Sequence, residues 1–219
     1  RAEFYLSKIV KYGLYAILLT PLVFWPKALY AFMTPKFILF QVLVEIVFCV
    51  WLILRLLRSD FGKLLKSNFN NRLVIALVLF IAISFISAIF GIDFSRSFWG
   101  IGARMTGLFA ELHFLVWLLV LVSYFKNKEE WNWYLNTSFA VSVLVAITGF
   151  FTVSEWRLVP GYTIFSNPTF VAPYFLFHFW WGLYQVYKSL NKFKIYFAAG
   201  SAVILWMLIL GQIRGVFIG

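Results

Sequence analysis

Charged residues and cysteine are scarce in this sequence, and each scarcity excludes a class of protein. Only 12% of the 219 residues are charged, whereas 63% are hydrophobic and the mean hydropathy is +0.89. Such a chain lacks the polar side chains that a water-facing surface needs, which excludes a water-soluble globular domain. The single Cys49 excludes a disulfide framework and a thiolate metal site. The composition therefore predicts an integral membrane protein.

Apolar stretches long enough to cross a membrane recur along the chain, and a spanning helix needs about 20 mostly apolar residues. The seven stretches are 12–32, 37–57, 73–90, 108–125, 134–152, 169–187 and 195–214. Continuous apolar runs favour helices over a membrane barrel, whose strands alternate apolar and polar side chains. We therefore predict an all-α fold, a polytopic transmembrane helical bundle of about seven spans in one domain, residues 1–219. The first stretch lacks a small-residue cleavage site, so we expect it to remain as a span.

Lysine and arginine divide unevenly between alternate loops, and this asymmetry predicts the orientation. Thirteen of the 19 lie at the N-terminus and in every second connecting segment, and six lie in the others. The N-terminus is therefore predicted to be cytoplasmic, and the segment FSRSFWGIGARMTG (94–107) is predicted to face outward. The net charge of +11 is the basic collar expected beside anionic lipid, so the bilayer is the expected partner and nucleic acid is not.

Arginine replaces lysine on the predicted outer side beyond the first short loop. The outer arginines are Arg96, Arg104, Arg157 and Arg214. A guanidinium group holds phosphate oxygens in a planar fork and stays charged when partly buried, which favours an anionic ligand. Snorkelling to the interface, or pairing with Asp93 and Glu155, would explain the same residues without a ligand. The sequence leaves both interpretations open.

Four motifs follow one another in a particular order. They are FWPKALYAFMTPKFILFQVLVEIVF (24–48), SRSFWGIGARMTGL (95–108), RLVPGYTIFSNPTFVAPYF (157–175) and GQIRGVFIG (211–219). Over nearly the whole chain this succession resembles the O-antigen ligase and polymerase family of membrane glycosyltransferases. The resemblance implies a GT-C-like enzyme of polysaccharide or lipopolysaccharide biosynthesis in the bacterial cytoplasmic (inner) membrane. Such an enzyme transfers a glycan from an undecaprenyl-pyrophosphate donor to a lipid, polysaccharide or protein acceptor.

The same resemblance implies which residues bind the donor. Arg104, Asn167 and Arg214 fall on positions of the family motifs, Arg157 aligns more loosely, and Arg96 occupies a variable position. The family's arginines are thought to engage the donor pyrophosphate, and fixed guanidinium groups stabilise such a leaving group without a metal or another cofactor. Ile213 departs from the usual Ser or Thr. Family members continue through further spans, and their catalytic base is a His in a later outer loop. We therefore expect this chain to be the N-terminal part of a longer enzyme, with its base beyond Gly219.

Other residues within or near the spans have structural interpretations beside functional ones. Trp99 suits sugar stacking or the interfacial aromatic belt, and the glycines of 94–107 are expected to shape that segment. His113 and His178 are expected to be hydrogen-bonded interior residues. For Glu111 a contact to Arg104 or His113 competes with catalysis, and for Glu45 we expect a packing or conformational role.

Two other functions remain open at this stage. A transporter or flippase of polyprenyl-linked glycans also needs outward arginines and many spans, although the sequence has no convincing internal repeat. A noncatalytic membrane scaffold is the third possibility, and it predicts that lysine can replace the outer arginines freely.

Overall fold

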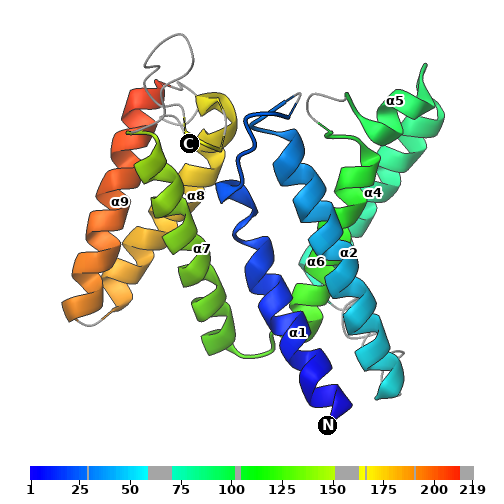
Figure 1. Cartoon of the computed structure of the whole chain (residues 1–219), viewed down its shortest axis with the longest axis horizontal. Coiled ribbons are helices and arrows are strands. Elements are labelled where there is room, and N and C mark those ends of the chain that lie inside the picture. Colours follow the sequence, from blue (N-terminus) through cyan, green and yellow to red (C-terminus); the bar gives the residue numbers. More distant parts are fainter. Residues whose placement is uncertain are drawn as a thin grey trace. The chain divides into compact units, whose positions relative to one another are not determined.

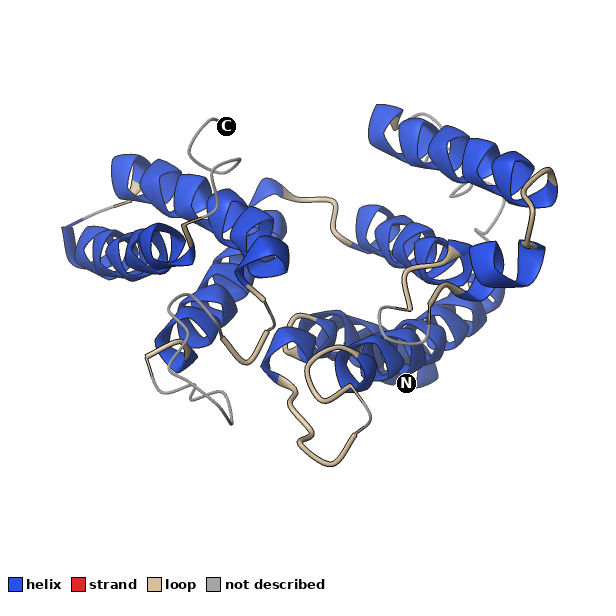
Figure 2. Cartoon of the chain, turned by 90° about the horizontal axis from the view of Figure 1, so that it is seen from above, coloured by secondary structure: helices blue, strands red, loops and turns tan. Residues whose placement is uncertain are grey.

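Every regular element that the structure describes is a helix. The computed structural model describes residues 1–28, 30–58, 71–101, 105–150, 163–165, 167–189 and 191–212. These contain eight α-helices and one 3-10 helix and no strand. Figure 2 shows helices joined by loops. The predicted all-α class is confirmed. Three helices among these residues, Thr34–Leu57, Arg72–Ile89 and Lys192–Gly211, are long and apolar enough to cross a membrane, and Leu108–Tyr124 is a shorter apolar helix. The chain therefore has the helices of a membrane protein.

The chain divides into two compact units, Arg1–Thr20 with Ala28–Trp131 and Pro21–Lys27 with Asn132–Gly219. Unit 1 holds the helices α1 (Ala2–Ile17), α2 (Thr34–Leu57), α4 (Arg72–Ile89), α5 (Phe94–Trp99) and α6 (Leu108–Tyr124). Unit 2 holds most of α7 (Lys128–Thr148) with α8 (Pro168–Lys188) and α9 (Asn191–Gly211). Each unit is described by itself, and the expectation of one transmembrane domain stays a prediction.

The first predicted span is misplaced. We expected a helix over 12–32, but α1 ends at Ile17 and a short 3-10 turn, Thr20–Leu22, follows. Pro21 lacks the backbone N–H that a continuing helix would use, its ring would crowd the Ile17 carbonyl four residues earlier, and Pro26 follows in the same stretch, so both prolines disfavour a longer α1. The Thr20 hydroxyl donates to the Ile17 carbonyl at 2.8 Å and satisfies one of the carbonyls that the end of α1 leaves open. The prediction of this span rested on apolar composition and took no account of the two prolines.

Unit 1 is held together by apolar packing along its helices and by polar contacts at one end. Gly13 lets α1 approach the Val47 side chain of α2 closely. The Tyr124 hydroxyl of α6 donates to the Ser7 carbonyl at 2.9 Å. The buried Arg55 of α2 donates to the Ser123 carbonyl at 3.2 Å, where the negative end of the α6 dipole favours a cation. Figure 1 shows the N-terminus and the last turns of α2 and α6 at this end of the unit, with α5 at the other end.

Unit 2 packs α7, α8 and α9 around one aromatic side chain. Phe139 of α7 is fully buried, and its ring lies against Gly182 of α8 and Gly200 of α9. A Cβ atom on Gly200 would lie 2.8 Å from the ring, so only glycine leaves room for it. Small residues that admit a bulky neighbour are the usual means by which helices pack closely in membranes. Val145, Phe175 and Ile204 complete the core around this contact.

The remaining predicted stretches coincide with helices, with one clear shift at a helix start. We expected a helix from residue 134, but α7 begins at Lys128. The Glu130 carboxylate accepts hydrogen bonds from the backbone N–H groups of Lys126 and Asn127, at 3.2 and 3.3 Å. This side-chain cap starts the helix within polar residues that a search for apolar stretches ignores.

Candidate functional site

The segment 94–107 contains a short helix where the sequence suggested only a loop. Asp93 precedes α5, and one of its carboxylate oxygens accepts the Arg96 backbone N–H at 3.0 Å, as an N-cap does. Gly100 ends the helix with φ +76°, and its N–H donates to the Arg96 carbonyl at 2.9 Å. One turn of helix therefore fixes Arg96 and Trp99 on a common support.

The two ends of the loop 100–107 touch each other through their backbones. A Cβ atom on Gly100 would lie 2.6 Å from the Gly107 nitrogen and 2.9 Å from the Thr106 nitrogen. Within the loop, the Met105 N–H donates to the Ile101 carbonyl at 2.8 Å, and Met105 has φ +50°. Gly100 and Gly107 therefore shape this segment, as predicted, while Gly102 lies outside the described residues.

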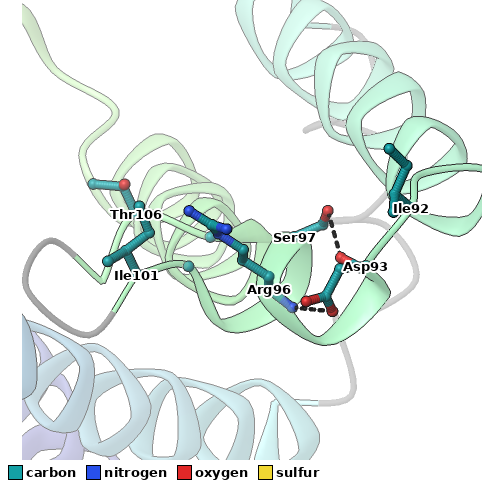
Figure 3. A pocket seen from close by; sticks show the side chains of 8 residues that line it. Ile92, Asp93, Arg96, Ser97, Ile101 and Thr106 are labelled. Atoms are coloured by element: carbon teal, nitrogen blue, oxygen red, sulfur yellow. Dashed lines mark hydrogen bonds between the residues drawn. The ribbon is translucent and has the colours of Figure 1, made fainter.

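A shallow, open pocket of about 550 Å³ lies where α5 meets this closed loop. It is lined by Ile92, Asp93, Arg96, Ser97, Gly100, Ile101, Thr106 and Gly107. Figure 3 shows the Arg96 guanidinium extending from α5 toward the side of the pocket formed by Ile101 and Thr106. The polar part of the lining consists of the Arg96 guanidinium and the Thr106 hydroxyl, which can bind an oxyanion, together with Ser97 and Asp93. The Ser97 hydroxyl donates to the Asp93 carbonyl at 3.0 Å.

The Arg96 guanidinium forms no ion pair with the neighbouring Asp93. Asp93 uses its carboxylate to cap the backbone of α5, and among the described residues the Arg96 guanidinium has no hydrogen bond or ion pair. The side chain is exposed beside the pocket. Of the two interpretations of the outer arginines, pairing with Asp93 is therefore wrong for Arg96, and Glu155 lies outside the described residues.

Trp99 lies on the same short helix and is supported by two aromatic rings. Its ring centroid is 5.0 Å from that of Phe109 at the start of α6 and 4.9 Å from that of Phe98. The residue is 59% exposed. The ring thus has a packed side and an open side, an arrangement compatible with sugar stacking and equally with an interfacial aromatic belt.

Of the other residues predicted to bind the donor, only Asn167 lies among the described residues, and it belongs to unit 2. Asn167 caps α8 in unit 2, where its side-chain oxygen accepts the Thr169 N–H at 2.9 Å, and Pro168 occupies the first helical position. The Asn-Pro pair of this motif therefore starts a helix. Arg104, Arg157 and Arg214 lie outside the described residues.

A pair of ionisable side chains joins α2 to α6, and the sequence did not predict this pairing. His113 Nε2 lies 3.1 Å from Glu45 Oε1, and His113 Nδ1 lies 2.7 Å from the Phe109 carbonyl. The sequence analysis singled out Glu45 and His113 separately. It did not predict a contact between them, because they are 68 positions apart in the chain. Buried, hydrogen-bonded His113 fits the structural role expected for it.

His178 also meets its expectation. It is buried between α7 and α8, with Nε2 2.8 Å from the Ser138 hydroxyl and Nδ1 2.7 Å from the Tyr174 carbonyl. Asn136 accepts hydrogen bonds from Trp181 and Gln185 at 3.0 and 2.8 Å, so several polar contacts join these two helices. Within the part of the chain that the structure describes, no group of three or more His, Cys, Asp or Glu residues is placed to hold a metal ion.

Comparisons of the chain with known protein families, curated proteins and solved structures found no match. The resemblance drawn from the motifs therefore stays a prediction.

Proposed function

We propose that this chain binds a lipid-linked anionic glycan donor and serves glycan transfer at the outer face of the bacterial cytoplasmic membrane. The donor is an undecaprenyl-pyrophosphate-linked glycan, and the acceptor is a lipid core, a growing polysaccharide or a protein. In this proposal the helices α1, α2, α4, α6, α7, α8 and α9 are the seven spans of an O-antigen ligase-like, GT-C-like fold.

One observation carries the proposal. The Arg96 guanidinium lies beside an open pocket and has no ion pair among the described residues, and the Asp93 carboxylate caps the backbone of α5. A guanidinium group that is not held in an ion pair is available to bind a negatively charged ligand. In the proposed orientation this pocket lies at the outer surface, where a lipid diphosphate would present its headgroup.

The chemistry of the transfer accounts for the need for arginine. Breaking the bond between the anomeric carbon and the pyrophosphate oxygen leaves negative charge on the departing pyrophosphate. Guanidinium groups held in place before the reaction stabilise that charge as it develops. We assign this role to Arg96 and, from the motif resemblance, to Arg104, Arg157 and Arg214. Asn167 and Trp99 are proposed to contact the donor's glycan or headgroup.

The test is an arginine-to-lysine series in the full-length protein. We expect Arg104→Lys, Arg214→Lys and Arg96→Lys to lower glycan transfer at least about tenfold, because lysine keeps the charge but loses the planar fork. Transfer from the lipid-linked donor is measured in membranes that contain equal amounts of each variant. Arg72→Lys, at the N-terminal end of α4, is the matched control and should transfer at the wild-type rate. Wild-type transfer by all the variants would exclude the proposal and favour a scaffold.

A transporter of polyprenyl-linked glycans is the second candidate. The pair formed by Glu45 and His113 favours it, because ionisable residues within spanning helices commonly mark transport pathways. The two functions separate in sealed vesicles: a transporter moves the lipid-linked glycan across the bilayer without an acceptor. Transfer that requires an acceptor, with no translocation in its absence, supports the enzyme.

A further inference from the structure

The hydrogen bond between Glu45 and His113 requires a proton in addition to the one that His113 donates to the backbone. His113 Nδ1 lies 2.7 Å from the Phe109 carbonyl. A carbonyl oxygen can only accept, so Nδ1 must carry the hydrogen of this bond. Nε2 of the same ring lies 3.1 Å from Glu45 Oε1. A neutral ring with its hydrogen on Nδ1 presents a lone pair at Nε2, and an ionised carboxylate presents another.

Two lone pairs at that distance repel each other, so the observed geometry needs one more proton between them. The proton resides on Nε2, giving an imidazolium and a carboxylate, or on Glu45, giving a neutral acid that donates to the ring. Both forms hold the same number of protons. We propose that Glu45 and His113 together form a proton-binding site, and that the contact between α2 and α6 at this level exists only while the proton is bound.

The location of the pair supports a functional site. Glu45 is eleven residues into α2, about 16 Å along the helix from Thr34 and thus near the middle of a helix long enough to span a membrane. Ionisable groups at such depths are expensive to maintain and are functional hypotheses by default. The His113 side chain is 9% exposed and that of Glu45 is 59% exposed. The Glu45 carboxylate is therefore the more accessible of the two groups.

The other titratable groups on the helices packed around the pair do not bond to it. On the helices that contact α2 or α6 they are Glu3, Tyr5, Lys8, Lys11, Tyr12 and Tyr15 on α1, Lys36, Cys49 and Arg55 on α2, Arg96 on α5, and Glu111 and Tyr124 on α6. The only titratable residue on α4 is Arg72, at its first position. Among the described residues, none of these forms a hydrogen bond or ion pair with Glu45 or His113.

The pair is linked to the short helix α5 through one aromatic residue. Phe109 accepts the His113 hydrogen bond with its carbonyl, and its ring lies 4.5 Å from the His113 ring, centroid to centroid. The same ring lies 5.0 Å from that of Trp99 on α5. His113 is six residues after Gly107, a pocket residue, and so about 9 Å along α6 from it. In the proposal, uptake of the proton holds α6 against α2 at the level of Glu45.

Nitrogen NMR of the imidazole rings tests the site directly, because the chain contains only two histidines. The full chain is labelled with ¹⁵N-histidine and placed in lipid nanodiscs, and a His113→Asn variant identifies the His113 signals. In the wild type we expect Nε2 to be protonated, or hydrogen-bonded to an acid, and to change in a single one-proton step as the pH rises. An Nε2 that is a free acceptor at every pH overturns the proposal.

Two variants distinguish a proton shared by Glu45 and His113 from a proton bound by His113 alone. Glu45→Gln keeps the shape of the side chain, and its amide can donate to Nε2 without an added proton. We expect His113 in this variant to lose its proton at a lower pH than in the wild type. Glu111→Gln removes a carboxylate from the same helix, two residues from His113, and should leave the step where it was. A step at the same pH in the wild type and in Glu45→Gln would overturn the proposal.

Discussion

Gly100 has a backbone conformation, φ +76° and ψ −170°, that almost no residue except glycine adopts without strain. It also lies against the backbone of Thr106 and Gly107, where a side chain has no room. The sequence indicated that glycines shape this segment. It could not indicate that Gly100 and Gly107 touch, because that depends on a loop closure between positions seven residues apart.

Replacing Gly100 with alanine should therefore open the pocket. We expect Gly100→Ala to lower the free energy of unfolding by about 1–3 kcal/mol, from the strained φ and the clash with the Gly107 nitrogen. Thermal unfolding in detergent measures the loss. Gly91→Ala is the matched control, because the three atoms nearest to its Cβ would be the Ser87 and Ala88 carbonyl oxygens and the Ser97 hydroxyl oxygen, at 3.3, 3.4 and 3.7 Å. If both variants unfold at the same temperature, the loop closure does not exist in solution.

Asp93 and Arg96 illustrate a choice that the sequence left open. An acidic residue three positions before an arginine suits an ion pair on a helix surface and equally an N-cap. The first would neutralise the arginine, and the second leaves its charge available. The structure has the N-cap, with Asp93 bonded to the Arg96 backbone and not to its guanidinium. The choice between the ion pair and the N-cap depends on the residue at which α5 begins. Helix propensity does not fix that start to one residue.

The helices themselves were largely predictable. Five predicted stretches agree with α2, α4, α6, α8 and α9 to within about four residues wherever their ends are described. Apolar composition is a sufficient signal there because each helix is long and continuously apolar. Apolar composition failed to predict the end of α1, because two prolines follow that helix. It also failed to predict the start of α7, because the Glu130 cap begins the helix within polar residues. The pairing of Glu45 with His113 was not predictable, because it depends on how α2 and α6 align.

The packing of three helices around Phe139 gives a prediction at the scale of elements. We expect Gly200→Ala to destabilise unit 2 by about 1–3 kcal/mol, because the new methyl group would lie 2.8 Å from a fully buried ring and 2.9 Å from Val143. Thermal unfolding in detergent measures the change.

Gly149→Ala is the control for this prediction. Its methyl group would lie 2.7 Å from the Met207 sulfur, but that flexible side chain can move aside. We therefore expect a much smaller loss in Gly149→Ala than in Gly200→Ala. Equal losses would show that crowding of the Phe139 ring does not limit the packing of α7, α8 and α9.

Orientation in the membrane is a property of the whole chain, and it was inferred from charge alone. Thirteen of 19 basic residues fall on the predicted cytoplasmic side, and polar contacts of Arg55, Arg58 and Tyr124 lie at that end of unit 1. The proposed site depends on the same inference, because a donor headgroup at the outer surface can meet Arg96 only if α5 lies outside. The orientation thus links the two ends of unit 1 to opposite faces of one membrane.

Labelling of single cysteines tests this orientation across α6. In a Cys49→Ser background, Ser95→Cys places a thiol on α5 and Asn127→Cys places one beyond the other end of α6, both at exposed positions. The 17 residues of α6 extend about 25 Å, close to the thickness of a bilayer core. A membrane-impermeant maleimide added to intact cells should label Ser95→Cys and not Asn127→Cys, and permeabilised cells should show both labelled. The reverse pattern would place the pocket in the cytoplasm and exclude an outward-facing donor site, and labelling of both in intact cells would mean that α6 does not cross the membrane.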